Sequence, residues 1–555
     1  MEKYTIGIDF GTESGRVIIA NVRNGNIKAL CVIPYTHGVI TQMLPIKQPI
    51  SIPHDFALQH PGDYLEVLYQ GIPKAISGSE ISPDQIIGIG IDFTSSTMIP
   101  TDQNLKPLCF YPSLRANPHS WAKLWKHHGP KHETNILHDR AIQVKPDWLK
   151  RYGFNISREW LIPKCFEVLN QDEFIYNQAD LFLEAGDWIV AQLTGQVVRS
   201  NCSLGFKALW HETKGFPETF LSTIHPELGQ MIHTKLRGKI GKVGECAGYL
   251  TTEMATKLGL PAELPVGVAI VDAHSAVLGT GVADSNRLAM VMGTSTCHMM
   301  LNEQEVPMPG ISGIVKDAIV PGFYAYESGQ SAVGDLFGWY ANQVPFSFAD
   351  EANKLQISVF DLLEKKAQQK KPGESGLIAL DWHNGNRSIL SDSDLTGLIV
   401  GLTLTSQPED IYRAYMEATA FGAKIIVKNY EEGGIQINDI LACGGLPQRN
   451  ECLMQIYADV LNHSINVFST EYAPAIGAAM LGATAAGKSS GGFDNVHDAV
   501  KQMQQPVLKT YHPIKKHVQI YEELFNIYKQ LHNHFGYENI MKKLKSVSTQ
   551  IQTAN

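Results

Sequence analysis

Charged residues, glycines and hydroxyl side chains separate two apolar runs in IGIDFGTESGRVII (residues 6–19). Among them are Asp9, Arg16, Gly11, Gly15, Thr12 and Ser14. The glycines let the backbone approach a ligand closely, and N–H groups and hydroxyls around such a tip form a concave site for phosphate oxygens. Asp9 suits a hydrated Mg²⁺ ion, and Arg16 suits an acid or a phosphate. A plain hairpin turn is the alternative, but tight hairpins prefer two-residue Asn-Gly tips.

Two common nucleotide-binding motifs do not fit this segment. It has neither the GK[ST] ending of a phosphate loop nor the GxGxxG fingerprint. Both motifs open a helix, whereas the run after this turn is predicted as a strand. A phosphate-binding turn on a hairpin is instead typical of the fold of actin, hexokinase and the Hsp70 chaperones.

A second turn repeats the design. The segment RLAMVMGTSTCHMMLN (287–302) places Gly293, Thr294 and Ser295 between two apolar runs. Two hairpins of this kind, one in each of two domains, are suited to hold one ATP molecule across a cleft.

A third segment, DILACGGLPQRNECLMQIYADVLN (439–462), is predicted as a strand, a double-glycine turn and an amphipathic helix. Gly444, Gly445 and Asn450 are candidates to contact the adenosine of ATP. An ordinary helix-entry loop gives the same local pattern, so the prediction depends on the two hairpins that precede it.

The repeat of strand, hydroxyl-rich turn and strand predicts two related halves, and 555 residues are too many for one ordinary core. Turn residues in VADSNR (282–287) mark the boundary, so we expect domains over 1–284 and 285–555. Scattered Trp, Lys, His and Pro residues between 100 and 265 predict helical insertions in the first domain. A mostly helical tail is expected from about residue 495.

Composition excludes several classes of protein. The net charge of −9 and pI near 6.1 argue against a nucleic-acid partner. No window has the roughly 18 apolar residues that a membrane helix requires, and the N-terminus has no pattern of a secretory signal. The eight cysteines are scattered without a CxxC pair, which disfavours disulfides and a zinc cage and favours a reducing cytoplasm.

Ten segments of the chain resemble the FGGY family of carbohydrate kinases. They are IGIDFGTESGR (6–16), HPGDYLE (60–66), GIGIDFTSSTMIP (88–100), GFKALWHE (205–212), VDAHSAVLGTG (271–281), VMGTSTCHMML (291–301), VPGFYAYESGQSAVGD (320–335), LDWHNGNRS (380–388), EATAFGAK (417–424) and GGLPQRN (444–450). The resemblance implies an α/β fold of two actin-like (ribonuclease H-like) domains. Each would have a mixed five-stranded sheet, with an ATP and sugar cleft between the domains.

Two segments favour one substrate within that family. GQSAVGD (329–335) and LDWHNGNR (380–387) are similar to those of kinases that phosphorylate L-ribulose, and also D-ribulose, in L-arabinose degradation. The cofactors implied are ATP and Mg²⁺, the partner is a small ketopentose, and a homodimer is plausible for the family. The alternatives are another sugar kinase of the family, such as one for xylulose, or an ATP switch like actin or a chaperone.

The resemblance also assigns residues. Asp272 matches the family's catalytic carboxylate, which accepts the proton of the sugar hydroxyl, and it also contacts the substrate; without the resemblance it would be taken as a helix cap. Ser95, Lys207 and Glu327 match substrate-binding positions. For His274, orientation of Asp272, contact with the sugar and simple packing stay open.

Two further segments are given structural roles. WKHHGPKHE (125–133) has three histidines and a glutamate, but their spacing fits no zinc pattern, and a solvated helix end is expected. Trp125 in this segment is a candidate for the lining of the sugar cleft. Residues 160–164 are expected to pack beneath the cleft.

Overall fold

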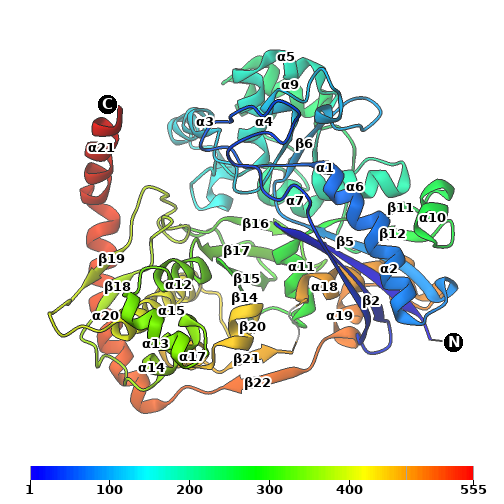
Figure 1. The fold of residues 1–555 in the computed structure, drawn as a ribbon. Helices are drawn as coiled ribbons and strands as arrows, with labels where there is room; N and C mark the ends of the chain where they lie inside the picture. Colours follow the sequence, from blue (N-terminus) through cyan, green and yellow to red (C-terminus); the bar gives the residue numbers. More distant parts are fainter. Residues whose placement is uncertain (1, 470–471, 554–555) are drawn as a thin grey trace.

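The N-terminal half of the computed structural model, which describes residues 2–469 and 472–553, is built on a seven-stranded mixed sheet (Figure 1). Its order is β11-β12-β5-β1-β2-β3, with β13 beside β5. The strands are β1 (Tyr4–Phe10), β2 (Ser14–Asn21), β3 (Ile27–Pro34), β5 (Ile86–Phe93), β11 (Cys246–Tyr249), β12 (Pro265–Gly267) and β13 (Ile270–Val271). The central strands β1 and β5 are buried along their whole length, as expected for a parallel pair covered on both faces.

The C-terminal half has a second seven-stranded mixed sheet, in the order β16-β17-β15-β14-β20-β21-β22. Its strands are β14 (Arg287–Met292), β15 (Thr296–Asn302), β16 (Gly313–Lys316), β17 (Tyr324–Gln330), β20 (Asp439–Cys443), β21 (Ile465–Phe468) and β22 (Val507–Tyr511). Both predicted hairpins are present, since β1 pairs with β2 and β14 with β15, each antiparallel. The expected five strands are extended to seven in each sheet.

One helix from the C-terminal half of the chain packs on the N-terminal sheet. Helix α18 (Ala473–Ala486) comes late in the chain but packs on β1 and β5 of the N-terminal sheet. Glycines make the approach possible: a Cβ on Gly90 would lie 1.7 Å from the carbonyl oxygen of Ala478, and one on Gly7 would lie 2.0 Å from that of Ala475. Close packing of the helix on the strands therefore requires glycine at both positions.

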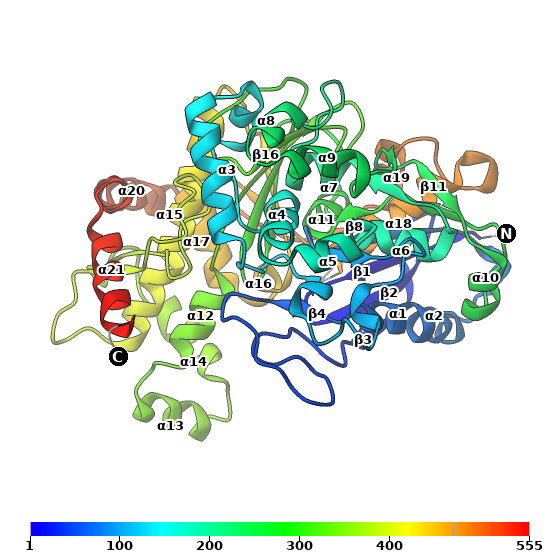
Figure 2. The same ribbon diagram turned by 90° about the horizontal axis from the view of Figure 1, so that it is seen from above.

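Two helices occupy the space between the sheets. Helix α11 (Asp272–Gly279) packs against α18, and one hydrophobic cluster includes residues of both helices and of both sheets. In Figure 1 the pair lies between β5 and the strands of the C-terminal sheet, and in Figure 2 α18 lies beside β1. The two halves therefore share a core as well as facing each other across a cleft.

The predicted insertion is largely helical and also contains a small sheet. Its helices are α3 (Lys131–Val144), α4 (Leu161–Gln171), α5 (Glu173–Gln178), α6 (Ala185–Thr194), α7 (Asn201–Lys207), α8 (Glu218–Ser222), α9 (Pro226–Thr234) and α10 (Thr252–Leu258). Strands β4 (Leu58–Gln59), β6 (Met98–Thr101), β7 (Ala122–Lys123) and β8 (Leu181–Glu184) form a four-stranded sheet, and β9 (Val198–Ser200) pairs with β10 (Lys239–Gly241). Helices α1 (Pro61–Glu66) and α2 (Ile72–Ser79) precede it and pack near β2 and β3.

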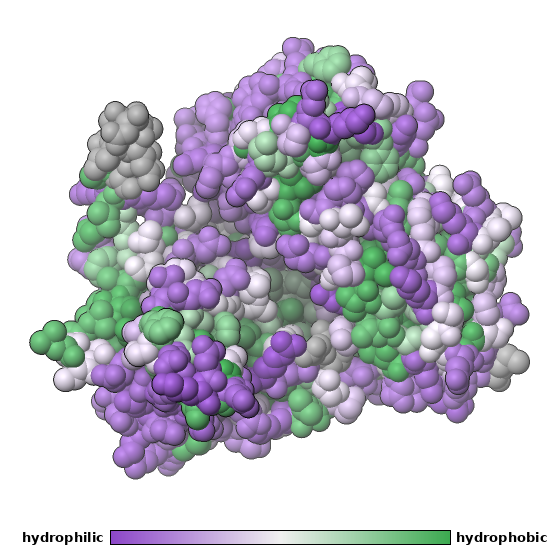
Figure 3. All heavy atoms as spheres, viewed as in Figure 1, coloured by the Kyte–Doolittle hydropathy of each residue, from purple (hydrophilic) through white to green (hydrophobic). Residues whose placement is uncertain are grey.

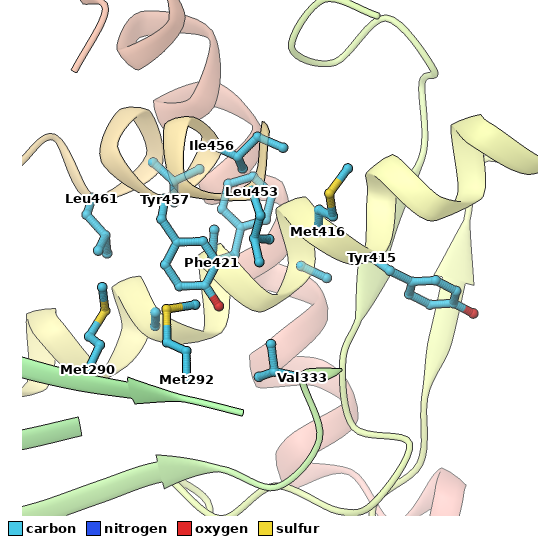
Figure 4. Close-up of a cluster of buried hydrophobic side chains, with 14 of the residues drawn as sticks. Met290, Met292, Val333, Tyr415, Met416, Phe421, Leu453, Ile456, Tyr457 and Leu461 are labelled. Atoms are coloured by element: carbon cyan, nitrogen blue, oxygen red, sulfur yellow. The ribbon is translucent and has the colours of Figure 1, made fainter. Parts of the chain in front are cut away.

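The C-terminal core packs helices on one face of β14. Figure 4 shows Met290 of this strand beside Leu461 and Met292 beside Tyr457, both of α17 (Glu451–Leu461), with Phe421 of α15 (Pro408–Glu432) in the same cluster. Burial of such side chains is worth about 1.5–3 kcal/mol each. The other C-terminal elements before the tail are α12 (Gly334–Ala341), α13 (Phe346–Lys354), α14 (Val359–Gln368), α16 (Gly445–Arg449), β18 (Ile378–Leu380) and β19 (Leu398–Val400).

The tail is mostly helical, as predicted, but it also completes the C-terminal sheet. Its helices are α19 (Val496–Met503), α20 (Lys515–Tyr537) and α21 (Ile540–Thr553), and β22, which pairs with β21, lies between α19 and α20. Throughout the described residues, no helix combines the length and apolarity needed to cross a membrane. All eight cysteines are free thiols.

Candidate active site

Three carboxylates converge where the N-terminal sheet meets α11. Asp9 of β1 and Asp92 of β5 are register partners in neighbouring parallel strands. The short strand β13 pairs with the same end of β5, placing Ile270 opposite Asp92 and leading directly into Asp272. The backbone N–H of Ala273 donates to Asp272 at 2.7 Å, and Asp272 is partly exposed.

No group donates a hydrogen bond to the carboxyl oxygens of Asp92, although the residue is fully buried. Burial raises its pKa well above the ordinary value, and the charges of Asp9 and Asp272 and a hydrogen bond from the protonated group to Asp9 raise it further. The same causes, burial first and then Asp9, raise the pKa of Asp272 to about 7. A buried polar group without a partner is costly, so this cluster is suited to a bound cation.

Carboxylate oxygens are the ligands that Mg²⁺ prefers. The two free oxygens of Asp92 and the neighbouring Asp9 therefore form a donor set that fits this ion. Arg16 already neutralises part of the charge, since its Nη1 lies 2.9 Å from Oδ2 of Asp9. The predicted metal role of Asp9 stays a prediction, and Asp92 is a member of the cluster that the sequence reasoning did not assign.

A signal for Asp92 is present in the sequence. The pentapeptide IGIDF occurs at 6–10 and again at 89–93, with Asp9 and Asp92 as its fourth residues. Identical strands that pair in parallel and in register bring identical side chains side by side. The repeat could therefore have placed Asp92 next to Asp9.

The first predicted phosphate turn connects β1 to β2. It closes on itself through a hydrogen bond from the N–H of Gly11 to the carbonyl of Ser14, 3.1 Å long. Trp125 donates from Nε1 to the hydroxyl of Thr12 at 3.1 Å, and Gln59 donates to the carbonyl of the same residue at 2.6 Å. Trp125 therefore lies beside the predicted nucleotide turn, and the turn is held from the insertion side.

The second turn, between β14 and β15, is more exposed. Gly293 and Thr294 are exposed and Ser295 is partly exposed. The carbonyl of Thr294 accepts hydrogen bonds from the N–H groups of Val333 and Asp335, at 2.8 and 3.1 Å. The N-terminus of α12 thus holds the turn through its carbonyls, and the N–H of Gly293 donates within the turn to the carbonyl of Ser295 at 2.8 Å.

The double-glycine turn after β20 lies against the second turn. A Cβ on Gly444 would lie 2.2 Å from the carbonyl oxygen of Met292, and its φ of 106° also favours glycine. Gly445 has open space where a side chain would be. Asn450 caps α17, because its Oδ1 accepts from the N–H of Leu453 at 2.7 Å.

The predicted sugar-binding residues Lys207 and Glu327 form a buried ion pair that joins the two halves. Lys207 Nζ lies 2.8 and 2.7 Å from the two carboxylate oxygens of Glu327. Burial would raise the pKa of Glu327, but Lys207 and His274 outweigh it and hold that pKa well below its usual range. His274 lies 3.2 Å from Glu327 and 3.0 Å from the sulfur of Cys202. His274 is therefore a buried partner of Glu327 rather than of Asp272.

Ser95 lies at a partly exposed turn after β5. Lys164 fixes this turn from below, since its Nζ donates to the carbonyls of Ser96 at 2.6 Å and Leu124 at 2.8 Å. The segment that ends at Lys164 is buried, which confirms its expected packing role. Figure 3 shows the surface hollowed near the centre of this face, between the two halves.

The expectation of a solvated helix end at 125–133 is only partly correct. Lys131 and His132 are exposed at the start of α3, but His127 and Glu133 are fully buried. Glu167 forms a buried ion pair with Lys123 at 2.9 Å, and the Nε2 of His127 lies 2.9 Å from the same carboxylate. Lys123 and Glu167 are buried because they neutralise each other, and burial lowers the pKa of His127 to about 3. A pattern of spacing along the sequence cannot reveal this cluster.

The chain is similar to two sequence models of one family. Residues 4–279 match the N-terminal domain and residues 288–486 the C-terminal domain of the "FGGY family of carbohydrate kinases". Among curated proteins, "Ribulokinase" of Staphylococcus aureus (strain Newman) is 50% identical over 98% of this chain and 99% of its own length. "Ribulokinase" of Anoxybacillus flavithermus is 48% identical over 98% of this chain and 97% of its own length.

Solved structures match the fold. Xylulose kinase from Lactobacillus acidophilus superposes with a TM-score of 0.77 at 19% identity, covering 97% of this chain and 99% of its own. Plasmodium falciparum glycerol kinase with ADP superposes with a TM-score of 0.74 at 18% identity, covering 95% and 98%. The expected two-domain α/β fold is confirmed.

Proposed function

The chain belongs to the FGGY family of carbohydrate kinases, and we propose that it transfers the γ-phosphate of ATP to L-ribulose in L-arabinose degradation, with D-ribulose as a second acceptor. The observation that carries the proposal is its near-full-length identity to a ribulokinase. The buried Lys207–Glu327 pair supports it, because one donor and one acceptor group suit a small substrate with a ketone and several hydroxyls.

ATP is proposed to lie across the cleft, with its phosphates between the two hairpins. The residues proposed to hold it are Gly11, Thr12, Ser14, Arg16, Gly293, Thr294, Ser295, Gly444, Gly445 and Asn450. The nearness of Gly444 to Met292 supports a single nucleotide site, because the second hairpin and the double-glycine turn are then parts of one surface. Mg²⁺ held by Asp9, with Asp92 beside it, would neutralise charge on the phosphates.

Asp272 is proposed as the base. In its charged form it accepts the proton of the sugar 5-hydroxyl, and that oxygen bonds to the γ-phosphorus. The bond to the β-phosphate oxygen breaks, and its electron pair leaves on ADP. A carboxyl whose pKa is raised to about 7 is a stronger base than an exposed aspartate, and it is still largely ionised at slightly alkaline pH.

Lys207 and Glu327 are proposed to part and hydrogen-bond the ketopentose together with Ser95. Their direct pair satisfies both charges until the sugar arrives. His274, buried against Glu327, fixes the orientation of that carboxylate. Because the pair bridges the halves, the sugar would contact both and favour closure of the cleft, which excludes water and limits ATP hydrolysis.

The test measures ADP release from ATP and Mg²⁺ in separate assays. One assay has no acceptor, and the others contain L-ribulose, D-ribulose, D-xylulose or glycerol. Strongest stimulation by L-ribulose is expected. Strongest stimulation by xylulose or glycerol would keep a sugar kinase but overturn the proposed substrate. A rate of ADP release that no sugar changes would instead indicate an ATP switch.

Two further points belong to the proposal. A reducing compartment, the cytoplasm, is supported by the eight free thiols. A homodimer stays a prediction, which light scattering of the purified protein tests directly.

A further inference from the structure

Arg387 lies over the strand that carries Glu327. Gly329 follows two residues after Glu327 on β17, so positions 327 and 329 face the same side of the sheet. A Cβ on Gly329 would lie 3.2 Å from Cδ and 3.5 Å from Nη1 of Arg387. The N–H of Gly329 also donates to the hydroxyl of Ser388 at 3.1 Å. The arginine therefore occupies the space that the glycine leaves open.

The neighbours of Gly329 along the sheet locate Arg387 relative to the proposed sugar and phosphate sites. Glu327, in the proposed sugar site, is two residues back along β17, or roughly 7 Å. In the other direction Gln330 is the register partner of Thr296, where the exposed turn of Thr294 and Ser295 ends. The guanidinium thus lies between the proposed sugar contacts and the proposed phosphate turn.

The charges around Cys297 support this position. Cys297 is the register partner of Gly329. Burial raises the pKa of its thiol to about 11, Arg387 opposes that rise, and Glu327 and Asp272 add to it. The thiol is therefore within electrostatic range of the arginine, of the proposed sugar ligand and of the proposed base at once.

The N–H donors of the Arg387 guanidinium are not engaged by the described residues around it. Its ion pair is with Glu159, at 3.8 Å, which is longer than a hydrogen bond. Within the residues that the structure describes, no hydrogen bond from the guanidinium is found, and the side chain is 23% exposed. Glu159 is itself bonded to His128 at 3.1 Å. An arginine held in place but without hydrogen bonds is suited to bind an anion bidentately.

We propose that Arg387 binds the phosphoryl group while it passes from ATP to the sugar, and the 5-phosphate of the product afterwards. This inference rests on the proposed function. In the transfer, the sugar oxygen bonds to phosphorus, its proton goes to Asp272, and the bond to ADP breaks with its electron pair on ADP. Arg387 exchanges no proton; its N–H groups stabilise the charge on the non-bridging oxygens.

The test compares five variants of the full chain. Arg387→Met and Arg387→Ala remove the donors, and Arg387→Lys keeps the charge but not the planar pair of donors. Glu159→Gln removes the ion pair alone. Arg158→Gln is the matched control, because this neighbouring arginine also reaches the other half, at Ser393, but on an exposed part of the surface.

Arg387→Met is expected to lower kcat by about 100-fold or more, with the KM for sugar changed only a few-fold. Arg387→Lys is expected to lose about tenfold, and the other two variants less than about threefold. The inhibition constant of the sugar 5-phosphate should rise at least about tenfold in Arg387→Met and not in Glu159→Gln. Added guanidinium ion should restore part of the activity of Arg387→Ala.

Near-normal kcat in Arg387→Met would overturn the inference, and so would an equal loss in Glu159→Gln, because the arginine would then act only as a contact between the halves. If Arg387→Met does not fold, a normal kcat and product inhibition in Arg387→Lys overturn it instead. The assay uses the sugar that the wild-type chain turns over fastest. A different best sugar therefore rejects the proposed substrate without deciding the role of Arg387.

Discussion

Asp9 and Asp92 face each other from adjacent parallel strands, and each is the fourth residue of the same pentapeptide. Asp9 is partnered by Arg16, and no group donates a hydrogen bond to the buried oxygens of Asp92. Two carboxylates in this arrangement repel each other unless a proton or a cation lies between them. The raised pKa of Asp92 favours a proton there when no ion is bound, and a divalent cation that replaced this proton would satisfy both side chains.

Removal of the Asp92 carboxyl group should weaken Mg²⁺ binding without lowering the stability of the ion-free protein. Mg²⁺ is expected to raise the thermal unfolding midpoint of the wild-type chain, and this rise should be lost in Asp92→Asn. Without Mg²⁺, the variant should be at least as stable as the wild type, because a neutral amide replaces a buried carboxyl group whose ionisation is disfavoured by burial and by Asp9. Asp84→Asn, at an exposed position, is the control. An undiminished Mg²⁺ response in Asp92→Asn would contradict the assignment.

Asp272→Asn should abolish most of the proposed chemistry. Without a base, sugar-stimulated ADP release is expected to fall by about 10²–10⁴-fold, while circular dichroism and the unfolding midpoint stay close to those of the wild type. The substitution removes a charge that burial and Asp9 disfavour, so the variant should stay folded. The fall in ADP release would then be due to the missing base. A folded variant with near-normal turnover would remove Asp272 from the mechanism.

Activity should fall on the acid side of neutrality. The pKa of Asp272 is raised to about 7 by burial and by Asp9, and only its ionised form accepts a proton. Log kcat/KM for the sugar is therefore expected to fall with a slope near one as pH drops below about 7. Higher Mg²⁺ should move this limb to lower pH, since a cation favours the ionised carboxylate. A profile flat from neutral pH to pH 5 would disagree with the assignment.

The Lys207–Glu327 pair is predicted to serve both stability and sugar binding. Lys207→Met leaves a carboxylate buried without its partner, which should lower the free energy of unfolding by on the order of 3 kcal/mol. The KM for L-ribulose should rise at least about tenfold, and the KM for ATP should change little. The double variant with Glu327→Gln should recover stability but not sugar binding. Chemical denaturation and initial-rate kinetics on the same preparations check both results.

The fold was largely predictable because its signals are local. The apolar runs and glycine turns around residues 11 and 294 predicted the hairpins that the structure contains. Strand β22 was missed within the tail because its sequence VLKTY has little alternation and is mostly exposed. Its pairing with β21 depends on a long-range contact, which propensity does not report.

The site was predictable only in part. Residues such as Lys207 were assigned by resemblance, and a lysine in an isolated stretch of sequence gives no sign of a carboxylate 120 positions away. The buried cluster of Lys123, His127 and Glu167 was missed for the same reason. The role proposed for Arg387 could not be predicted from the sequence, because it depends on the space that Gly329 leaves open on a strand distant in the sequence.

Packing of α18 on the N-terminal sheet gives a stability prediction. Gly90→Ala would place a Cβ 1.7 Å from the carbonyl oxygen of Ala478, so the helix must shift or the strand must bend. We expect a loss of about 1–3 kcal/mol or more, read from denaturant unfolding. Gly78→Ala is the matched control, because nothing lies within 4 Å of its added methyl group in α2, and alanine favours a helix. Equal stability of the two variants would contradict the tight packing.

The late position of α18 has a consequence for biosynthesis. Strands β1 and β5 leave the ribosome early, but residues 473–486 that cover them are made much later. Until then the nascent chain exposes an apolar surface with glycines at its centre, which is the kind of surface that chaperones bind and that aggregates. For the same reason, a fragment that ends at the boundary near residue 284 would lack one wall of its own core, and it should be degraded rapidly by proteases that spare the full chain.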